Sequence, residues 1–211
     1  MKHILSNCVL ALNPYTRRHN EVLKILFDVT AKQLDAINNG KRPQKTEIGG
    51  SIKFVRPGQK DFIRPAKKMI DDERWTGTWN ISADLPGQQS SFVILTTKKP
   101  DIVVWCTKRK VVFLVELTVP HEDNINAAQV RKDDRYEELL EKCEDAGWDA
   151  THHSVEVGCR SFVGNRLKKW LINIGLPKRT INKSIKELEE VTEKASHWIW
   201  LKRNDEFWQE G

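Results

Sequence analysis

The sequence predicts an α/β protein in which helices flank a mixed central sheet. The first observation is a pair of apolar, β-rich runs, 102–106 and 111–119, around a polar four-residue turn at 107–110, which is typical of a β-hairpin. The second is a long polar helix expected over 122–146, followed by a short strand at 154–157. Because a strand–helix–strand crossover is right-handed and joins parallel strands, this last strand should run parallel to the second hairpin strand.

The elements before the hairpin are predicted to be one long helix and several short strands. Residues 17–37 repeat apolar side chains at helical spacing, and Asn20 is a candidate cap or first-turn residue. Alternating residues predict strands over 51–56 and 79–85, and 92–97 has a strand-like composition.

The elements after the hairpin are predicted to be helical, apart from the crossover strand. Gly147 is a typical stop for the helix over 122–146. Two closing helices are expected over 161–174 and 180–203. The crossover helix carries an apolar stripe that should face the sheet, made of Ala128, Tyr136, Leu139 and Cys143.

Composition indicates one folded domain and excludes a membrane span or a collagen-like chain. The 211 residues are 39% hydrophobic and 30% charged, and no apolar run approaches the ~18 residues that cross a bilayer. The net charge of +6 is uneven: residues 1–70 hold 14 basic and 5 acidic side chains, whereas 71–147 hold 10 basic and 15 acidic ones. A basic arm is typical of a polyanion-binding protein, and the acidic middle is where carboxylates concentrate.

The chain is not expected to be secreted. Its four cysteines are far apart and form no CxxC pair, which fits reduced thiols rather than a disulfide framework. The first twelve residues superficially resemble a secretion signal, but Ser6 and Asn7 interrupt the apolar stretch and no small-residue cleavage site follows. A short helix is predicted there instead.

Two carboxylates are predicted to face each other at the open end of the hairpin. The turn length pairs Ile102 with Val115, and one step further it pairs Asp101 with Glu116. Cross-strand Cβ atoms lie ~4.5–5.5 Å apart, and Glu116 sits in an apolar run, so two buried like charges would need a proton or a cation between them. Mg²⁺ is the simplest solution because it prefers oxygen ligands. The alternative is that the hairpin frays at Pro100 and leaves Asp101 in water.

A lysine lies on the apolar stripe of the crossover helix. Lys132 is four residues after Ala128 and four before Tyr136, so its ammonium should face the sheet. Beside a metal and two acids, a lysine can orient a water and stabilise charge on phosphorus, as phosphodiester hydrolysis requires. The alternative is a surface lysine whose stem covers apolar groups while its charge stays in water.

These residues resemble the PD-(D/E)XK nuclease family. The motif consists of Pro100-Asp101, fourteen intervening residues, and Glu116-Leu117-Thr118. The resemblance implies a restriction-endonuclease-like core, a mixed sheet flanked by helices with the motif on a hairpin before a crossover helix. The chain departs from the family at Thr118, where a Lys is usual. In some branches that Lys has moved to the next helix, where this chain has Lys132.

One such branch is the restriction-like endonuclease of site-specific non-LTR retrotransposons. Residues 131–136 are similar to its K-x-x-[KR]-Y pattern, 18–20 (RHN) to its R-H-[DN] element, and 3–8 to the second half of its CCHC zinc knuckle. The resemblance divides the chain into 1–16, a knuckle remnant or leading helix, and 17–211, the endonuclease domain. Zinc is not expected, because two ligands of the knuckle are missing. Three further stretches also look like parts of related element-encoded proteins: 116–120, 156–160 and 195–203.

The resemblance implies a metal site and a role for each of its residues. Asp101 and Glu116 would bind Mg²⁺, or Mn²⁺ in its place, with the carbonyl of Leu117 as a further ligand. Lys132 would position the attacking water. Asp84, at a strand end, is an additional candidate ligand, although it is equally typical of the turn that follows it.

DNA contacts are expected from basic side chains, because neutralised phosphates supply most of the affinity. Arg18 and His19 would touch DNA or order the site, and His19 could instead cap the first helix. Glu21 is a further candidate acid, and His121 is expected to cap the crossover helix rather than bind metal. The other DNA-binding candidates lie in a basic stretch, for which a solvated face is the alternative, and on the crossover helix: Lys53, Arg56, Lys60, Arg64, Lys67, Lys68, Arg131 and Arg135.

The predicted function is a Mg²⁺-dependent DNA endonuclease that hydrolyses phosphodiester bonds and nicks target DNA for retrotransposon insertion. The alternatives are a catalytically inactive DNA-binding module of the same fold, which Thr118 favours, and a related nuclease acting on RNA or branched DNA. Expected partners are DNA and the element RNA or reverse transcriptase of a parent protein, and no membrane. The expected compartment is the nucleus for a eukaryotic retroelement and otherwise the cytoplasm.

Overall fold

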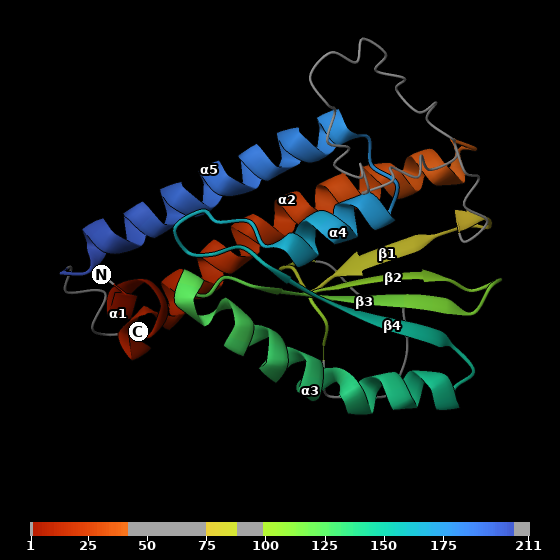
Figure 1. Cartoon of the computed structure of the whole chain (residues 1–211), viewed down its shortest axis with the longest axis horizontal. Coiled ribbons are helices and arrows are strands. Elements are labelled where there is room, and N and C mark those ends of the chain that lie inside the picture. Colours follow the sequence, from red (N-terminus) through yellow and green to blue (C-terminus); the bar gives the residue numbers. More distant parts are fainter. Residues whose placement is uncertain (1, 42–74, 88–98, 205–211) are drawn as a thin grey trace, which may run out of the picture.

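The computed structural model of the chain describes residues 2–41, 75–87 and 99–204. Within them a four-stranded mixed sheet has the order β1-β2-β3-β4. Helix α3 lies on one face of the sheet, and α2, α4 and α5 lie on the other (Figure 1). The predicted mixed sheet with flanking helices is therefore confirmed. The predicted strands over 51–56 and 92–97 lie outside the described residues.

The elements follow one another in a simple order along the chain. The strands are β1 (Asn80–Ala83), β2 (Ile102–Cys106), β3 (Val111–Thr118) and β4 (Asp149–Glu156). The α-helices are α1 (Lys2–Ser6), α2 (Leu12–Asn38), α3 (Ile125–Asp145), α4 (Asn165–Asn173) and α5 (Lys178–Lys202). Short 3₁₀ turns, η1 (Val9–Ala11) and η3 (Glu122–Asn124), precede α2 and α3.

The hairpin has the register that its turn length predicts. Cys106 pairs with Val111 and Ile102 with Val115 in the antiparallel β2–β3 ladder. Strand β1 adds to β2 in the antiparallel sense, and β4 lies parallel to β3 after the crossover through α3. Both the hairpin and the parallel crossover are confirmed.

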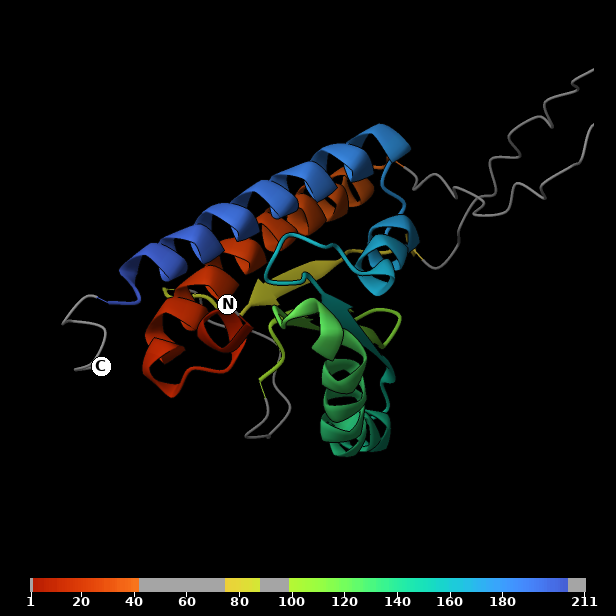
Figure 2. The same ribbon diagram turned by 60° about the vertical axis from the view of Figure 1, so that its left-hand side comes forward.

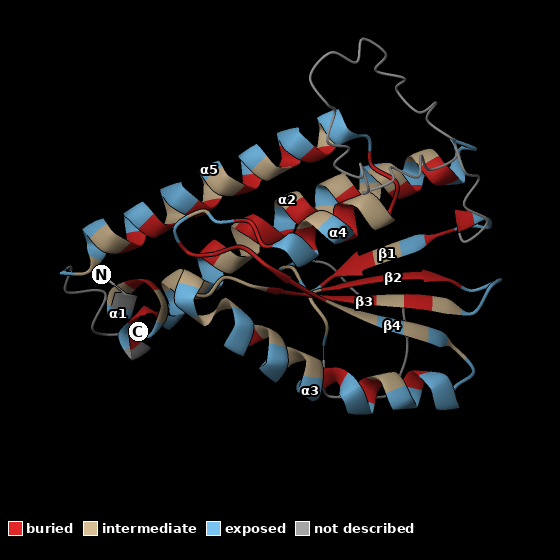
Figure 3. Ribbon diagram, in the orientation of Figure 1, coloured by how far each residue is buried: buried red, intermediate tan, exposed pale blue. Residues whose placement is uncertain are grey.

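Helices cover both faces of the central strands, so alternate residues enter two separate cores. On one face Val103, Trp105 and Leu114 pack with Tyr136 of α3. On the other, Ile102, Val104, Val115 and Leu117 pack against apolar residues of α2, α4 and α5. All five residues of β2 are buried, as Figure 3 shows, because a strand covered on both faces has no solvent side.

Helices α2 and α5 lie side by side along one face of the molecule (Figures 1 and 2). Their buried residues include Thr30 and Thr192, whose hydroxyls donate to carbonyls of their own helices at 2.8 and 2.7 Å. The predicted cap at Asn20 is wrong, because α2 begins at Leu12. Pro14 fits its first turn, where a missing N–H leaves no helical bond unmade.

The first residues of the chain pack onto the C-terminal end of the fold. Leu5, Cys8 and Ala11 form an apolar cluster with Cys159 and Ile199. Helix α2 runs without a break through residues 16 and 17, the division proposed from the sequence. A short helix near the N-terminus is confirmed as α1. Among the described residues, no helix has both the length and the apolar character needed to cross a membrane.

Candidate active site

The predicted pair of carboxylates meets at the end of the β2–β3 hairpin. Asp101 directly precedes β2, and its backbone N–H donates to Oε2 of Glu116 at 3.3 Å. In return, the backbone N–H of Leu117 donates to Oδ2 of Asp101 at 2.7 Å. The hairpin therefore does not fray at Pro100, and the predicted juxtaposition of the two acids is confirmed. Because Glu116 accepts the backbone N–H of Asp101 and Asp101 accepts that of Leu117, the end of the hairpin holds both side chains in place.

Helix α3 supplies two partners for the buried carboxylate of Glu116, which is 4% exposed. The ammonium of Lys132 donates to Oε1, and the hydroxyl of Tyr136 donates to Oε2 at 2.7 Å. Burial, together with the charge of Asp101, raises the pKa of Glu116, although Lys132 and Tyr136 act in the opposite direction. The prediction that Lys132 faces the sheet is confirmed.

Tyr136, which the sequence predicts only as a core residue, also belongs to the site. Its ring is buried and stacks on His152 with the ring centroids 4.8 Å apart, while its hydroxyl reaches Glu116 and the carbonyl of Lys99. Burial and the nearby Glu116 charge raise the pKa of Tyr136. Its spacing of four from Lys132 was a usable signal, because residues four apart share one helix face.

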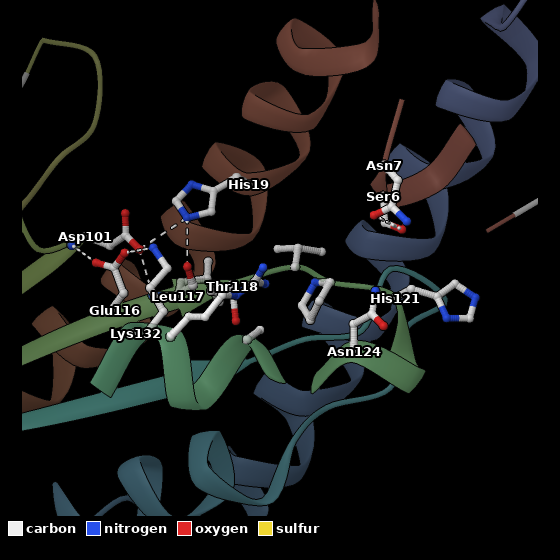
Figure 4. Close-up of a pocket in the computed structure, with 14 residues that line it drawn as sticks. Ser6, Asn7, His19, Asp101, Glu116, Leu117, Thr118, His121, Asn124 and Lys132 are labelled. Carbon is white, nitrogen blue, oxygen red and sulfur yellow. Dashed lines mark hydrogen bonds and ion pairs between the residues drawn. The ribbon is translucent and has the colours of Figure 1, made fainter. Parts of the chain in front are cut away.

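His19 comes from α2 and approaches the pair from the opposite side of the site (Figure 4). Its Nε2 lies 3.2 Å from Oδ2 of Asp101 and 3.3 Å from the carbonyl oxygen of Leu117. Burial alone would favour the neutral ring, but the hydrogen bond and charge of Asp101 hold the pKa of His19 above its ordinary value. Of the roles expected for His19, the geometry favours ordering the site, and capping is excluded because the helix begins earlier.

An open cavity of about 350 Å³ lies over these residues. His19, Asp101, Glu116, Leu117 and Lys132 all line it, and Figure 4 shows their side chains grouped on one side of it. Arg131 of α3 lies on the rim, adjacent in sequence to Lys132. The remaining lining comes from the chain after β3, the start of α3 and the N-terminal turn: Ser6, Asn7, Thr118, Val119, Pro120, His121, Asn124 and Ala128.

The donor groups around the cavity fit a hard divalent cation. They are the carboxylates of Asp101 and Glu116 and the carbonyl of Leu117, all oxygen donors of the kind Mg²⁺ prefers. Within the described residues no three His, Cys, Asp or Glu side chains converge as a ready-made metal site. A ligand set at this position therefore has to include backbone oxygen as well as side chains.

Zinc does not fit the N-terminal segment in this arrangement. His3 is exposed, whereas Cys8 is buried in the apolar cluster with Leu5 and Cys159. All four cysteines are free thiols. Zinc needs four ligands, and His3 and Cys8 supply two that lie in different surroundings.

Two other acids and one histidine were also candidates for the site. Asp84 is exposed and outside the cavity lining, although its backbone N–H donates to the carbonyl of Asp101 at 2.9 Å. Glu21 is paired with Arg17 at 2.9 Å and also lies outside the lining. His121 accepts the backbone N–H of Asp123, so its predicted capping role at the start of the crossover helix is confirmed.

Arg18 corrects the prediction that it touches DNA. It is only 2% exposed, and its guanidinium donates to the carbonyl of Val119 at 3.2 Å and to Oγ of Ser196 at 3.0 Å. Burial lowers its pKa. Arg18 therefore joins α2 to the chain after β3 and to α5, which a single sequence does not reveal because arginine is usually exposed.

The other DNA-binding candidates divide into two groups. Arg131 and Arg135 are exposed on α3, as DNA contact requires. The guanidinium of Arg135 lies 5.9 Å from the ring centroid of Tyr136. The remaining six lie outside the described residues: Lys53, Arg56, Lys60, Arg64, Lys67 and Lys68.

Comparisons with known proteins found no match to this chain, either among protein-family models or among curated proteins. The residues around the cavity are therefore interpreted from their own chemistry. Two carboxylates, a lysine, a histidine and a backbone carbonyl oxygen on an open surface are suited to binding a cation next to an anionic substrate.

Proposed function

We propose that this chain is a Mg²⁺-dependent DNA endonuclease of the PD-(D/E)XK type, which nicks target DNA for retrotransposon insertion. The observation that carries the proposal is the convergence of Asp101, Glu116, Leu117 and Lys132 on one open cavity. These four come from a hairpin and from the helix after it, in the order that the resemblance implies.

The metal would be held by Asp101, Glu116 and the carbonyl of Leu117. Bound there, Mg²⁺ would supply a Lewis acid that lowers the pKa of a water and neutralises charge on the phosphate. The backbone N–H groups of Asp101 and Leu117 orient the two carboxylates before any ligand arrives. Such preorganisation matters because no reorganisation is then needed during the reaction.

Lys132 is proposed to orient the attacking water and to stabilise the negative charge that develops on the phosphate. Its ammonium reaches the cavity from α3 while its stem is partly buried, so it lies in a medium where charges interact strongly. It replaces the lysine that the family usually has at position 118. Thr118 cannot serve in that role, since a hydroxyl carries no positive charge.

DNA binding is proposed to use the basic residues around the cavity. Arg131 lines the cavity, and Arg135 is exposed one turn further along α3. The basic residues of the segment 53–68 would extend the contact. Phosphate contacts of this kind position the backbone without reading its sequence.

A catalytically inactive DNA-binding module of the same fold is the second candidate function. Two observations favour it. Thr118 departs from the family motif, and its Oγ1 is buried without a hydrogen-bond partner among the described residues. The ammonium of Lys132 is also bonded to Glu116 rather than free.

Nicking of supercoiled plasmid in Mg²⁺ separates the two functions. A nuclease converts the plasmid to open circle in Mg²⁺ but not in EDTA, and Asp101→Ala and Glu116→Ala abolish the conversion. Lys132→Met should reduce the rate roughly 10²–10³-fold, as loss of a charge-stabilising donor does. Glu141→Gln and Lys142→Met are matched controls on the exposed side of α3 and should cut at the wild-type rate.

Two outcomes would reject the nuclease. Cleavage that survives in both Asp101→Ala and Glu116→Ala would assign the activity to a contaminant or another site. Salt-dependent DNA binding without any cleavage would leave the inactive module. Duplex, branched and single-stranded DNA, and RNA, tested in parallel identify the preferred substrate.

A further inference from the structure

The ring of His19 lies against two of the groups that the proposed function assigns to the metal ion. Its Nε2 is 3.2 Å from Oδ2 of Asp101 and 3.3 Å from the carbonyl oxygen of Leu117, and Figure 4 shows both contacts as dashed lines. One nitrogen thus faces two acceptor oxygens at nearly equal distances. A proton or a cation has to lie between such atoms, because all three carry lone pairs.

These distances are those of neighbouring ligands around one ion. Mg²⁺ holds octahedral ligands at about 2.0–2.1 Å, and an imidazole nitrogen binds zinc at about the same distance. Adjacent corners of an octahedron of that size are about 3 Å apart. The Nε2 of His19 is therefore spaced from both oxygens as a third ligand would be.

The fold holds the ring at this position. The residue before it, Arg18, is buried and bonds to the carbonyl of Val119 and to Oγ of Ser196. Val119 is two residues beyond Leu117, so the same contact that anchors α2 also sets the distance between His19 and the end of β3. This explains why a buried arginine and the histidine are adjacent in the chain.

The second ring nitrogen has the partner that a metal-binding histidine uses. Nδ1 of His19 lies 3.4 Å from Oδ1 of Asn20. Histidines that bind metals through one nitrogen usually donate the other N–H to an oxygen, which fixes the tautomer and the ring orientation. Residues 18–20 thus have three roles: Arg18 anchors α2, His19 is placed as a ligand, and Asn20 orients the ring of His19.

We propose that His19 is a nitrogen ligand of the metal ion, alongside the carboxylate of Asp101 and the carbonyl oxygen of Leu117. This rests on the proposed function, since it concerns the same metal site. It adds a nitrogen ligand to the site and so changes which metal ion is expected there. An imidazole favours transition metals over Mg²⁺, so the chain should bind Mn²⁺ more tightly than Mg²⁺.

Electron paramagnetic resonance of Mn²⁺ bound to the full chain tests this without reference to cleavage. With the histidines labelled with ¹⁵N, a directly bound imidazole couples to the Mn²⁺ electron spin. The coupling should be present in the wild type and in His197→Ala, an exposed histidine on α5, and absent in His19→Ala. Calorimetric titration should show the Mn²⁺ dissociation constant rising roughly tenfold or more in His19→Ala.

The outcomes separate this proposal from the one it rests on. Mn²⁺ that binds without nitrogen coupling, or with coupling that survives in His19→Ala, would overturn the histidine ligand and leave the carboxylate site standing. No Mn²⁺ binding at millimolar concentration, with or without DNA, would remove the metal site and the proposed function together. Because His121 also lines the cavity, the assignment to His19 depends on the variant, so the circular dichroism spectrum of His19→Ala must match that of the wild type.

Discussion

Replacing Glu116 by Gln should make the metal-free protein more stable while abolishing nicking. The substitution keeps the shape of the side chain but removes one of two adjacent negative charges. Lys132 and Tyr136 bond to different oxygens of Glu116, so the amide oxygen of Gln would accept from Lys132 while its NH2 group donates to the hydroxyl oxygen of Tyr136. Burial and the charge of Asp101 raise the pKa of Glu116, so they outweigh its two stabilising partners. The ionised carboxylate therefore destabilises the fold when no cation is present.

The magnitude follows from the link between pKa and free energy. Each unit by which the pKa is raised costs about 1.4 kcal/mol of unfolding free energy at a pH where the group is ionised. We expect a gain on the order of 1 kcal/mol for Glu116→Gln, which for a chain of this size raises the melting temperature by roughly 2–4 °C. This is opposite to the usual effect of a substitution at a buried site.

The pH dependence of stability provides a second test of whether Glu116→Gln stabilises the protein. A carboxyl whose pKa is raised in the folded state binds its proton more tightly there than in the unfolded chain. The destabilising effect of ionised Glu116 is full above the folded-state pKa of this group. It disappears as the pH falls through the pKa of the same group in the unfolded chain, about 4.5. The difference in melting temperature between Glu116→Gln and the wild type should thus be present at pH 7.5 and vanish near pH 4.

Thermal melts in EDTA and in Mg²⁺ provide the assay, with Glu141→Gln as the control. Glu141 is exposed on the same helix, so its substitution removes an equal charge without touching the site. Mg²⁺ should stabilise the wild type and not Glu116→Gln, since a ligand stabilises only the form that binds it. The reasoning fails if Glu116→Gln melts at or below the wild-type temperature in EDTA at pH 7.5 while Glu141→Gln is unchanged.

Three further predictions concern Tyr136, Arg18 and Arg131. Tyr136→Phe removes the hydroxyl that stabilises ionised Glu116, so the pKa of Glu116 should rise further. The acidic limb of the nicking–pH profile should then move to higher pH. If the limb does not move, Glu116 does not control it. Arg18→Ala should lower the unfolding free energy by several kcal/mol, because it leaves buried acceptors unpaired, with little change in the salt dependence of DNA binding. Arg131→Ala should instead keep the stability and reduce the slope of log affinity against log salt by about 1; the opposite assignment of these two effects would contradict the burial of Arg18.

Much of the candidate site could be predicted from local sequence patterns. A four-residue turn and alternating side chains predict that Asp101 lies beside Glu116. In the structure the paired ladder ends at Ile102 and Val115, and hydrogen bonds to the carboxylates of the two acids bring them together just beyond it. Helical spacing places Lys132 on the face of α3 that meets the sheet. In both cases the residues concerned are close in the chain, so local geometry alone brings them together.

Other features were hidden because residue type is a poor guide to burial. The strand predicted over 154–157 begins earlier in the structure, at Asp149, because polar residues such as His152 and His153 pack there against aromatic rings. In the fold, His152 stacks on Tyr136, and His153 packs against Trp170 with its ring centroid 4.9 Å away. Burial lowers the pKa of His153 to about 4, so this ring behaves as a neutral aromatic group.

Sequence pattern was therefore sufficient for the α/β class, the hairpin register, the parallel crossover and the pair of acids with their lysine, because each depends on periodicity within one or two neighbouring elements. The arrival of His19 at the same site was decided by tertiary packing. His19 and Leu117 are 98 residues apart, and they meet because buried Arg18 anchors α2 against the end of β3 and against α5. Contacts between distant segments depend on how whole helices pack on the sheet, and no local pattern encodes that packing.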